Sequence, residues 1–161
     1  PAGRKRQYRF IPGHRGVSFW RAKTLAEMSD AEWESLCDGC AQCCLIKLQD
    51  DETAQVHYTA IVCDLLDQDA CRCTRYPQRH RLVPACIEIS ADNACQLDRL
   101  PASCAYRLIA RGEDLPAWHH LLIGSGEEVH EVGVSVRGRV IARQFVHTDD
   151  EQNYVVDWVE Q

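Results

Sequence analysis

The stretch that decides the fold is Cys37-Asp38-Gly39-Cys40-Ala41-Gln42-Cys43-Cys44, which carries four thiols within eight residues. Neighbouring cysteines pair poorly as disulfides, because the bond needs a Cα separation of about 4.4–6.8 Å and an unstrained dihedral angle. Metal ligation has no such difficulty. A metal–sulfur bond of about 2.3 Å lets thiolates separated by two residues converge on one ion, and Gly39 permits the tight turn. The stretch therefore predicts a metal site.

The other six cysteines, Cys63, Cys71, Cys73, Cys86, Cys95 and Cys104, continue the short spacing, so all ten lie between residues 37 and 104. A disulfide framework of a secreted protein would staple the whole chain. It would also need an export signal, whereas Arg4, Lys5 and Arg6 are followed by polar and aromatic residues. No stretch approaches the ~20 apolar residues of a membrane span. We expect reduced thiols, no membrane segment and a cytoplasmic location.

Charge divides the chain unevenly. The 161 residues carry a formal net charge of −6 and are 45% apolar, enough for one globular domain. Residues 1–23 hold seven Lys and Arg and no acid, which leaves eleven bases against twenty-four acids in the rest. An acidic body repels phosphate backbones, so nucleic-acid binding is not expected of it. The arm itself could bind nucleic acid or a partner through Arg with Tyr8, Phe10, Phe19 and Trp20. We favour a solvated extension, or a strap that folds onto the acidic body.

Local signals predict short elements. Thr24 with Glu27 and Ser29 with Glu32 read as capping boxes, followed by a helix over 30–37 that delivers Cys37. Residues 45–49 and 55–62 predict a hairpin that returns Cys63 to the motif. The segment 64–86 reads as loop, 87–89 as a short strand and 91–99 as a helix. A further helix begins at Pro101 and stops at Gly112.

The C-terminal third is read as an irregular segment over 113–126 and then a hairpin. Alternating valines at 132–136, a turn at 137–138 and a return over 140–146 predict the two strands. The expected fold is a small single α+β domain of short helices and β-hairpins cross-linked by a cysteine-ligated metal centre. Its parts are a basic N-terminal arm (1–23), a cysteine-cluster metal-binding domain (24–126) and a C-terminal hairpin extension packed on it (127–161).

The motif and its surroundings resemble a known family. The residues that carry the resemblance are the run 36–44, Cys63, Cys71-x-Cys73, Tyr76, Arg79, Pro84-x-Cys86 and 101–107. Through them the chain resembles the bacterial CxxCxxCC cysteine-cluster family of zinc- or iron-chelating proteins, and is nearest its YcgN-like branch. The resemblance covers about residues 19–125. It implies the metal ligands Cys37, Cys40, Cys43, Cys44, Cys63, Cys71, Cys73, Cys86 and Cys104. Cys95 and the basic arm lie outside the pattern.

Nine thiols do not divide into tetrahedral sites of four. Two zinc ions would leave one thiol over, whereas a polynuclear cluster with bridging sulfurs could use all nine. An iron–sulfur cluster is the other possibility, but ferredoxin runs place the fourth cysteine further on and follow it with proline. We favour zinc over iron or an iron–sulfur cluster.

Two classes of function remain open at the level of sequence. One is a non-catalytic metal-binding protein, structural or carrier, since metal ligation alone contributes folding free energy of order 10 kcal/mol. The other is a redox or enzymatic iron–sulfur protein. We favour the first. Arg75, Arg79 and Arg107 could offset thiolate charge. His80, His119 and His120 could be extra ligands or a proton relay, and Asp64, Asp67 and Asp69 could add oxygen ligands to a hard ion. We favour packing or surface roles for the histidines and a solvated loop for the aspartates.

Overall fold

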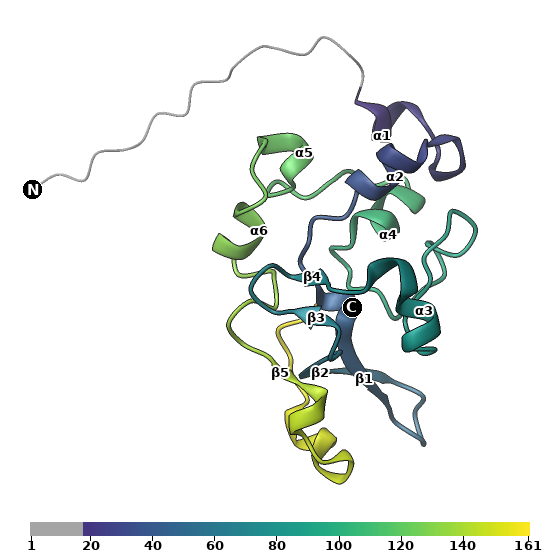
Figure 1. Cartoon of the computed structure of the whole chain (residues 1–161). Coiled ribbons are helices and arrows are strands. Elements are labelled where there is room, and N and C mark those ends of the chain that lie inside the picture. Colours follow the sequence, from purple (N-terminus) through teal and green to yellow (C-terminus); the bar gives the residue numbers. More distant parts are fainter. Residues whose placement is uncertain (1–17) are drawn as a thin grey trace, which may run out of the picture.

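A computed structural model describes residues 18–161, and Figure 1 shows its short helices arranged around small sheets. Residues 1–17 of the predicted arm, with Tyr8 and Phe10, lie outside the described residues. No helix of the described part is long and apolar enough to cross a membrane. The mixture of short helices and strands agrees with the α+β class predicted from the sequence.

Both predicted capping boxes form at the N-terminal end. Helix α1 spans Phe19–Ala22, a 3-10 turn spans Leu25–Glu27 and α2 spans Asp30–Ser35. The Ser29 hydroxyl accepts a hydrogen bond from the Glu32 amide, and the Glu32 carboxylate accepts one from the Ser29 amide at 2.8 Å. These bonds satisfy donors that a helix start leaves free. The helix predicted over 30–37 thus exists but ends two residues earlier.

The predicted hairpin after the motif is confirmed. Strands β1 (Leu45–Gln49) and β2 (Val56–Val62) pair antiparallel, with Leu45 opposite Val62 and an irregularity between Leu45 and Lys47. The Asp50 carboxylate accepts hydrogen bonds from the amides of Glu52 and Thr53 and so closes the turn. In Figure 1 this hairpin extends away from the helices.

The remaining elements are short. They are β3 (Leu66–Asp67), β4 (Arg72–Cys73), α3 (Arg79–Leu82), α4 (Ala105–Ala110), α5 (His120–Ile123), α6 (Glu128–Glu131), β5 (Ile141–Ala142) and 3-10 turns at Tyr76–Gln78, Arg143–Phe145 and Thr148–Tyr154. Strands β3 and β4 form a second small antiparallel pair inside the segment predicted as loop. The helix expected from Pro101 begins at Ala105, and Gly112 with φ of 75° follows its end as predicted.

The hairpin predicted over 132–146 is wrong. Gly133 and Gly138 both have positive φ and turn the chain, so the valine alternation does not become a strand. Val136 is fully buried and its amide donates to the Cys40 carbonyl at 3.0 Å. Only β5 is extended, and it pairs parallel with β2.

The helix predicted over 91–99 and the strand at 87–89 are also wrong. Residues 91–99 form successive turns. The Asn93 side chain accepts from the Ser90 amide and donates to the Glu88 carbonyl. Such local side-chain bonds compete with helix and sheet hydrogen bonds. The segment 113–126, predicted irregular, contains α5.

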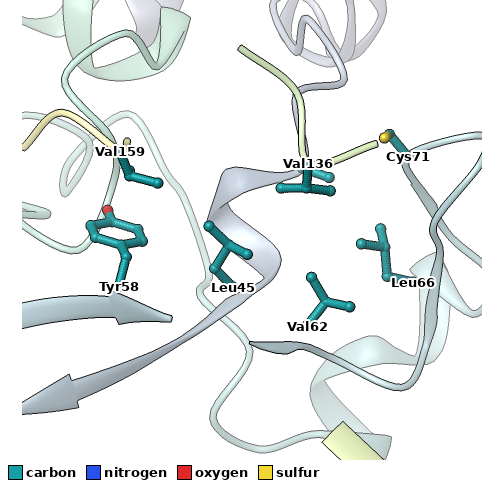
Figure 2. Close-up of a cluster of buried hydrophobic side chains, with 8 residues drawn as sticks. Leu45, Tyr58, Val62, Leu66, Cys71, Val136 and Val159 are labelled. Carbon is teal, nitrogen blue, oxygen red and sulfur yellow. The ribbon is translucent and has the colours of Figure 1, made fainter. Parts of the chain in front are cut away.

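Two hydrophobic clusters enclose the motif. The first, shown in Figure 2, contains Ala41, Leu45, Tyr58, Val62, Leu66, Cys71, Val136 and Val159. The second contains Trp20, Leu25, Leu36, Ala94, Ala105, Tyr106 and Leu115. Leu36 belongs to one cluster and Ala41 to the other, so the motif crosses between them. Burying each such side chain stabilises the fold by about 1.5–3 kcal/mol.

The end of the predicted arm packs on the acidic body, in agreement with the strap interpretation for Phe19 and Trp20. Trp20 lies in the second cluster with Phe19 against it, and its indole N–H donates to Asp114. Arg21 forms an ion pair with the same carboxylate. These contacts join residues 18–23 to the domain.

Candidate metal centre

The motif folds as a tight turn because two of its residues adopt left-handed backbone conformations. Gly39 has φ of 79° and Ala41 has φ of 59°. The Asp38 carboxylate accepts a hydrogen bond from the Cys40 amide through Oδ1 at 3.0 Å. A 3-10 turn then spans Gln42–Cys44. The chain reverses direction here, which distributes the four thiols around one compact turn.

The C-terminal segment holds this turn in place. Val136 donates its amide hydrogen to the Cys40 carbonyl, and the buried Gln42 side chain donates to the Val134 carbonyl at 2.6 Å. Buried backbone groups are normally paired in this way. Residues 134–136 therefore form a wall of the motif turn, although they lie more than ninety positions further along the chain.

The β1–β2 hairpin returns Cys63 to the motif, as predicted. The Cys63 amide donates to the Cys44 carbonyl at 3.1 Å. The adjoining residues, Val62 before Cys63 and Leu45 after Cys44, are paired in the sheet. The Leu66 amide then donates to the Cys63 carbonyl and starts the segment that carries Cys71 and Cys73. The hairpin thus connects the motif with the later thiols.

Three thiols around the motif are shielded from solvent. Burial raises the pKa of Cys37 to about 11, with further contributions from the charges of Cys43 and Asp38. Burial raises the pKa of Cys40 well above its usual range, and the charges of Asp38 and Cys43 add to this effect. Burial raises the pKa of Cys104 to about 12. These groups carry thiolate charge near neutral pH only if a cation stabilises it.

The adjacent pair behaves differently. A hydrogen bond from the Cys44 thiol lowers the pKa of Cys43 to about 7, with help from the Lys47 ammonium. The same bond raises the pKa of Cys44, to which burial and the charges of Cys43, Cys63 and Cys86 contribute. Cys43 is also the exposed member of the pair. The motif therefore contains one thiol with a pKa near neutral pH.

Eight of the nine predicted ligands share one electrostatic neighbourhood. Burial raises the pKa of Cys86, and the charges of Cys43, Cys63 and Cys73 raise it further. The pKa values of Cys37, Cys40, Cys44 and Cys104 respond to the charges of neighbouring thiols in the same way. The thiols linked by these charge effects are Cys37, Cys40, Cys43, Cys44, Cys63, Cys73, Cys86 and Cys104.

Cys71, the ninth predicted ligand, lies in the first hydrophobic cluster. Its side chain is buried, and Figure 2 shows the sulfur beside Val136. The thiol donates weakly to the Gln68 carbonyl at 3.6 Å, and burial raises its pKa. Cys95, which lies outside the family pattern, is exposed on the turns that replace the predicted helix.

Positive side chains face the thiols. The Lys47 ammonium donates to the carbonyls of Cys43 and Leu45 at 3.0 and 2.8 Å. Arg72 points a guanidinium nitrogen at the Cys37 sulfur, 3.9 Å away, and Arg79 lowers the pKa of Cys86 by its charge. Sequence reasoning identified Arg79 but missed Lys47 and Arg72, for which the CxxCxxCC spacing gives no signal.

Other polar residues singled out from the sequence have structural partners. Arg107 is buried and donates to the Leu100 carbonyl. Both ring nitrogens of His119 are engaged, one with the Leu36 carbonyl at 2.9 Å and one with the Leu121 amide at 3.2 Å. Asp64 accepts from the Gln144 amide, and Asp67 accepts from two amides of its own turn. His119 therefore packs rather than ligates.

The donor set suits a thiophilic cation. Soft thiolates select zinc, copper(I) and iron–sulfur clusters. One buried oxygen near them, Oδ2 of Asp38, has no hydrogen-bond donor in the described part of the chain. Within residues 18–161, no three His, Cys, Asp or Glu side chains stand close enough to hold one ion as they are placed. The thiols lie around the motif, but their sulfur atoms do not converge on a single position among residues 18–161.

Comparison with known proteins agrees with this chemistry. A family model described as "Putative zinc- or iron-chelating domain" matches residues 36–105. A UPF0260 protein of Pseudomonas putida GB-1 is 49% identical over 138 residues, covering 86% of this chain and 92% of the relative. UPF0260 proteins of Rhodopseudomonas palustris and Cellvibrio japonicus are each 50% identical over 141 residues, covering 87% and 88% of this chain and 83% and 96% of their own. No solved structure matches.

Proposed function

Since this chain belongs to the UPF0260 family, and residues 36–105 match the model described as "Putative zinc- or iron-chelating domain", we propose that it binds zinc or iron through a polythiolate centre built around the motif turn. The role is structural or that of a carrier, with zinc favoured. The same centre, loaded with an iron–sulfur cluster, would give the redox or enzymatic alternative.

One observation carries the proposal. The Cys63 amide donates to the Cys44 carbonyl, which holds the start of the 63–86 segment against the motif turn. Three further thiols, Cys73, Cys86 and Cys104, come from outside the hairpin and influence the same group of sulfurs. Thiols gathered from separate segments, with positive side chains beside them, form a donor set that a metal ion stabilises.

We sort the eight thiols around the motif into two groups of four. Cys37, Cys40, Cys43 and Cys104 all respond to the charge of Asp38. Cys44, Cys63, Cys73 and Cys86 form the second group, linked through Cys44 and Cys86. We assign each group to one metal ion and Cys71 to packing. Adjacent Cys43 and Cys44 then belong to different sites, which resolves the count of nine.

The chain's own residues determine how such a centre would work. A bound ion supplies positive charge that keeps the buried thiols ionised. Lys47 and Arg72 lie beside Cys43 and Cys37 and offset the excess negative charge of four thiolates. Cys43 is an exposed residue of the motif, and a ligand residue at the surface suits a carrier better than a closed structural site.

Elemental analysis of protein prepared without air tests the proposal. We expect zinc or iron bound to the wild-type chain. Cys40→Ser should lose at least one ion, whereas Cys95→Ser, at an exposed thiol outside the centre, should retain the wild-type content. Brown protein absorbing near 400 nm would select the iron–sulfur alternative, since zinc thiolate is colourless. Metal-free wild-type protein, or equal metal content in the two variants, would refute the proposal.

A further inference from the structure

The side chain of Asp38 holds an unexplained oxygen. The residue is only 9% exposed, and its Oδ2 has no hydrogen-bond donor among the residues that the structure describes. An unpaired buried polar atom destabilises the fold, and more so when it is charged. Within the described chain, only a few other buried side-chain atoms are in this position, on Gln42, Arg107 and Trp118, and none of those is an anion.

The other oxygen explains why the side chain stays in place. Oδ1 accepts the Cys40 amide at 3.0 Å and fixes the carboxylate across the motif turn. An asparagine could make that bond equally well, since its side-chain oxygen is also an acceptor and favours such turns. The turn alone therefore does not require a second, charged oxygen in a buried position.

The surroundings of Asp38 contain thiols together with the guanidinium of Arg72, which lies beside the adjacent Gly39. The carboxylate is bonded to the Cys40 amide within the motif turn, next to Cys37, and its charge also reaches Cys43 and Cys104. The nearby guanidinium of Arg72 is directed at the Cys37 sulfur. A buried carboxylate among thiolates is stable when a cation lies between them.

From this arrangement we propose that Asp38 is an oxygen ligand, through Oδ2, of the metal ion held by the thiols of the motif turn. The inference rests on the proposed metal-binding function and assigns a ligand outside the cysteine pattern. Zinc accepts carboxylate oxygen together with thiolate sulfur. A ligating carboxylate also commonly has its second oxygen hydrogen-bonded, which is the role of the Cys40 amide here.

The test compares Asp38→Asn with Asp50→Asn. Asp50 accepts amide hydrogens in the exposed β1–β2 turn, at 2.9 Å from Glu52 and 2.7 Å from Thr53, away from the thiols. Both substitutions keep an oxygen that can accept from the backbone and remove one charge. Metal affinity is measured by competition with a chelator of known affinity, using zinc and then cobalt(II). We expect Asp38→Asn to bind at least about 10-fold more weakly, since even the loss of a residue that only supports a ligand costs this much, and Asp50→Asn to match the wild type.

X-ray absorption of the zinc-loaded protein gives a second readout that does not depend on the variant folding. The wild type should show an oxygen shell at about 2.0–2.2 Å beside the sulfur shell at about 2.3 Å. The oxygen shell should weaken in Asp38→Asn. A sulfur-only wild-type spectrum, or an Asp38→Asn variant with unchanged affinity and spectrum, would overturn the inference while leaving the thiolate centre intact. Wild-type protein that binds no zinc or cobalt would refute the proposed function itself.

Discussion

Replacement of Gly39 by alanine tests how closely the motif turn and the β3–β4 segment approach each other. A Cβ at Gly39 would lie 3.3 Å from Arg72 Nη2 and 3.4 Å from its Cζ, and the residue has φ of +79°. The left-handed conformation costs alanine about 1–2 kcal/mol. Reduced freedom of the unfolded chain returns about 0.4–1 kcal/mol of that. The backbone effect alone should therefore lower the free energy of unfolding by about 1 kcal/mol.

The contact with Arg72 adds a second effect. To clear the new methyl group, the guanidinium must move by a few tenths of an ångström, away from the Cys37 sulfur 3.9 Å from it. An exposed charge contact of this kind contributes up to about 1 kcal/mol. Gly112→Ala is the matched control, because Gly112 has φ of +75° and a Cβ added there would have no neighbouring atom within 4 Å.

Urea unfolding of the metal-loaded protein, followed by fluorescence, measures both effects. We expect Gly112→Ala to lose about 1 kcal/mol and Gly39→Ala up to about 1 kcal/mol more, with faster loss of metal to a chelator. In an Arg72→Ala background the two glycine variants should become equal, as a double-mutant cycle requires of a coupled pair. Equal behaviour of Gly39→Ala and Gly112→Ala in the wild-type background would refute the reasoning.

Three further predictions follow from the described contacts. Cys71→Ala should retain the wild-type metal content, because this sulfur packs beside Val136, and it should lower the free energy of unfolding by about 1–2 kcal/mol; loss of an ion in elemental analysis would return Cys71 to the ligand set. Removal of the metal at neutral pH should abolish hydrogen-exchange protection over residues 63–86, where the elements are two to four residues long, while β1–β2 keeps more of its protection; protection of 63–86 that survives complete removal would contradict a structural role. Arg21 holds the pKa of Asp114 below its usual range, so this pair stabilises the fold above about pH 4 and ceases to do so as pH falls through the depressed value; the melting temperature of Asp114→Asn should lie below that of the wild type at pH 7 and converge with it in acid, and parallel curves would show that the pair contributes nothing.

Local signals in the sequence predicted the elements that depend on local bonds. The capping boxes at Thr24 and Ser29 require only residues three positions apart, and both are present. The β1–β2 hairpin could be predicted from the sequence because an acidic turn separates two apolar runs. The resemblance to a cysteine-cluster family rested on the cysteine run together with residues such as Tyr76, Arg79 and Pro84, and a family model matches residues 36–105.

The errors came where distant contacts decide the conformation. The valines at 132–136 alternate as a strand would, yet Val136 is used to cover the motif turn and its amide bonds Cys40. Asn93 diverts the 91–99 segment into turns by side-chain bonds. The charges of Lys47 and Arg72 reach the thiols only through the fold, so no spacing rule could assign them.

The bond between Val136 and Cys40 also limits how the chain can be divided. The family-matched span, residues 36–105, supplies Leu45, Tyr58 and Val62 to the first hydrophobic cluster, but Val136 and Val159 come from beyond it. On the other side, Trp20 and Leu115 complete the second cluster from outside the same span. Excised on its own, the span would expose both apolar surfaces and lose a wall of the motif turn. The thiol-bearing segment therefore does not form a self-sufficient folding unit, and a fusion that keeps its structure must also include Trp20, Leu115, Val136 and Val159.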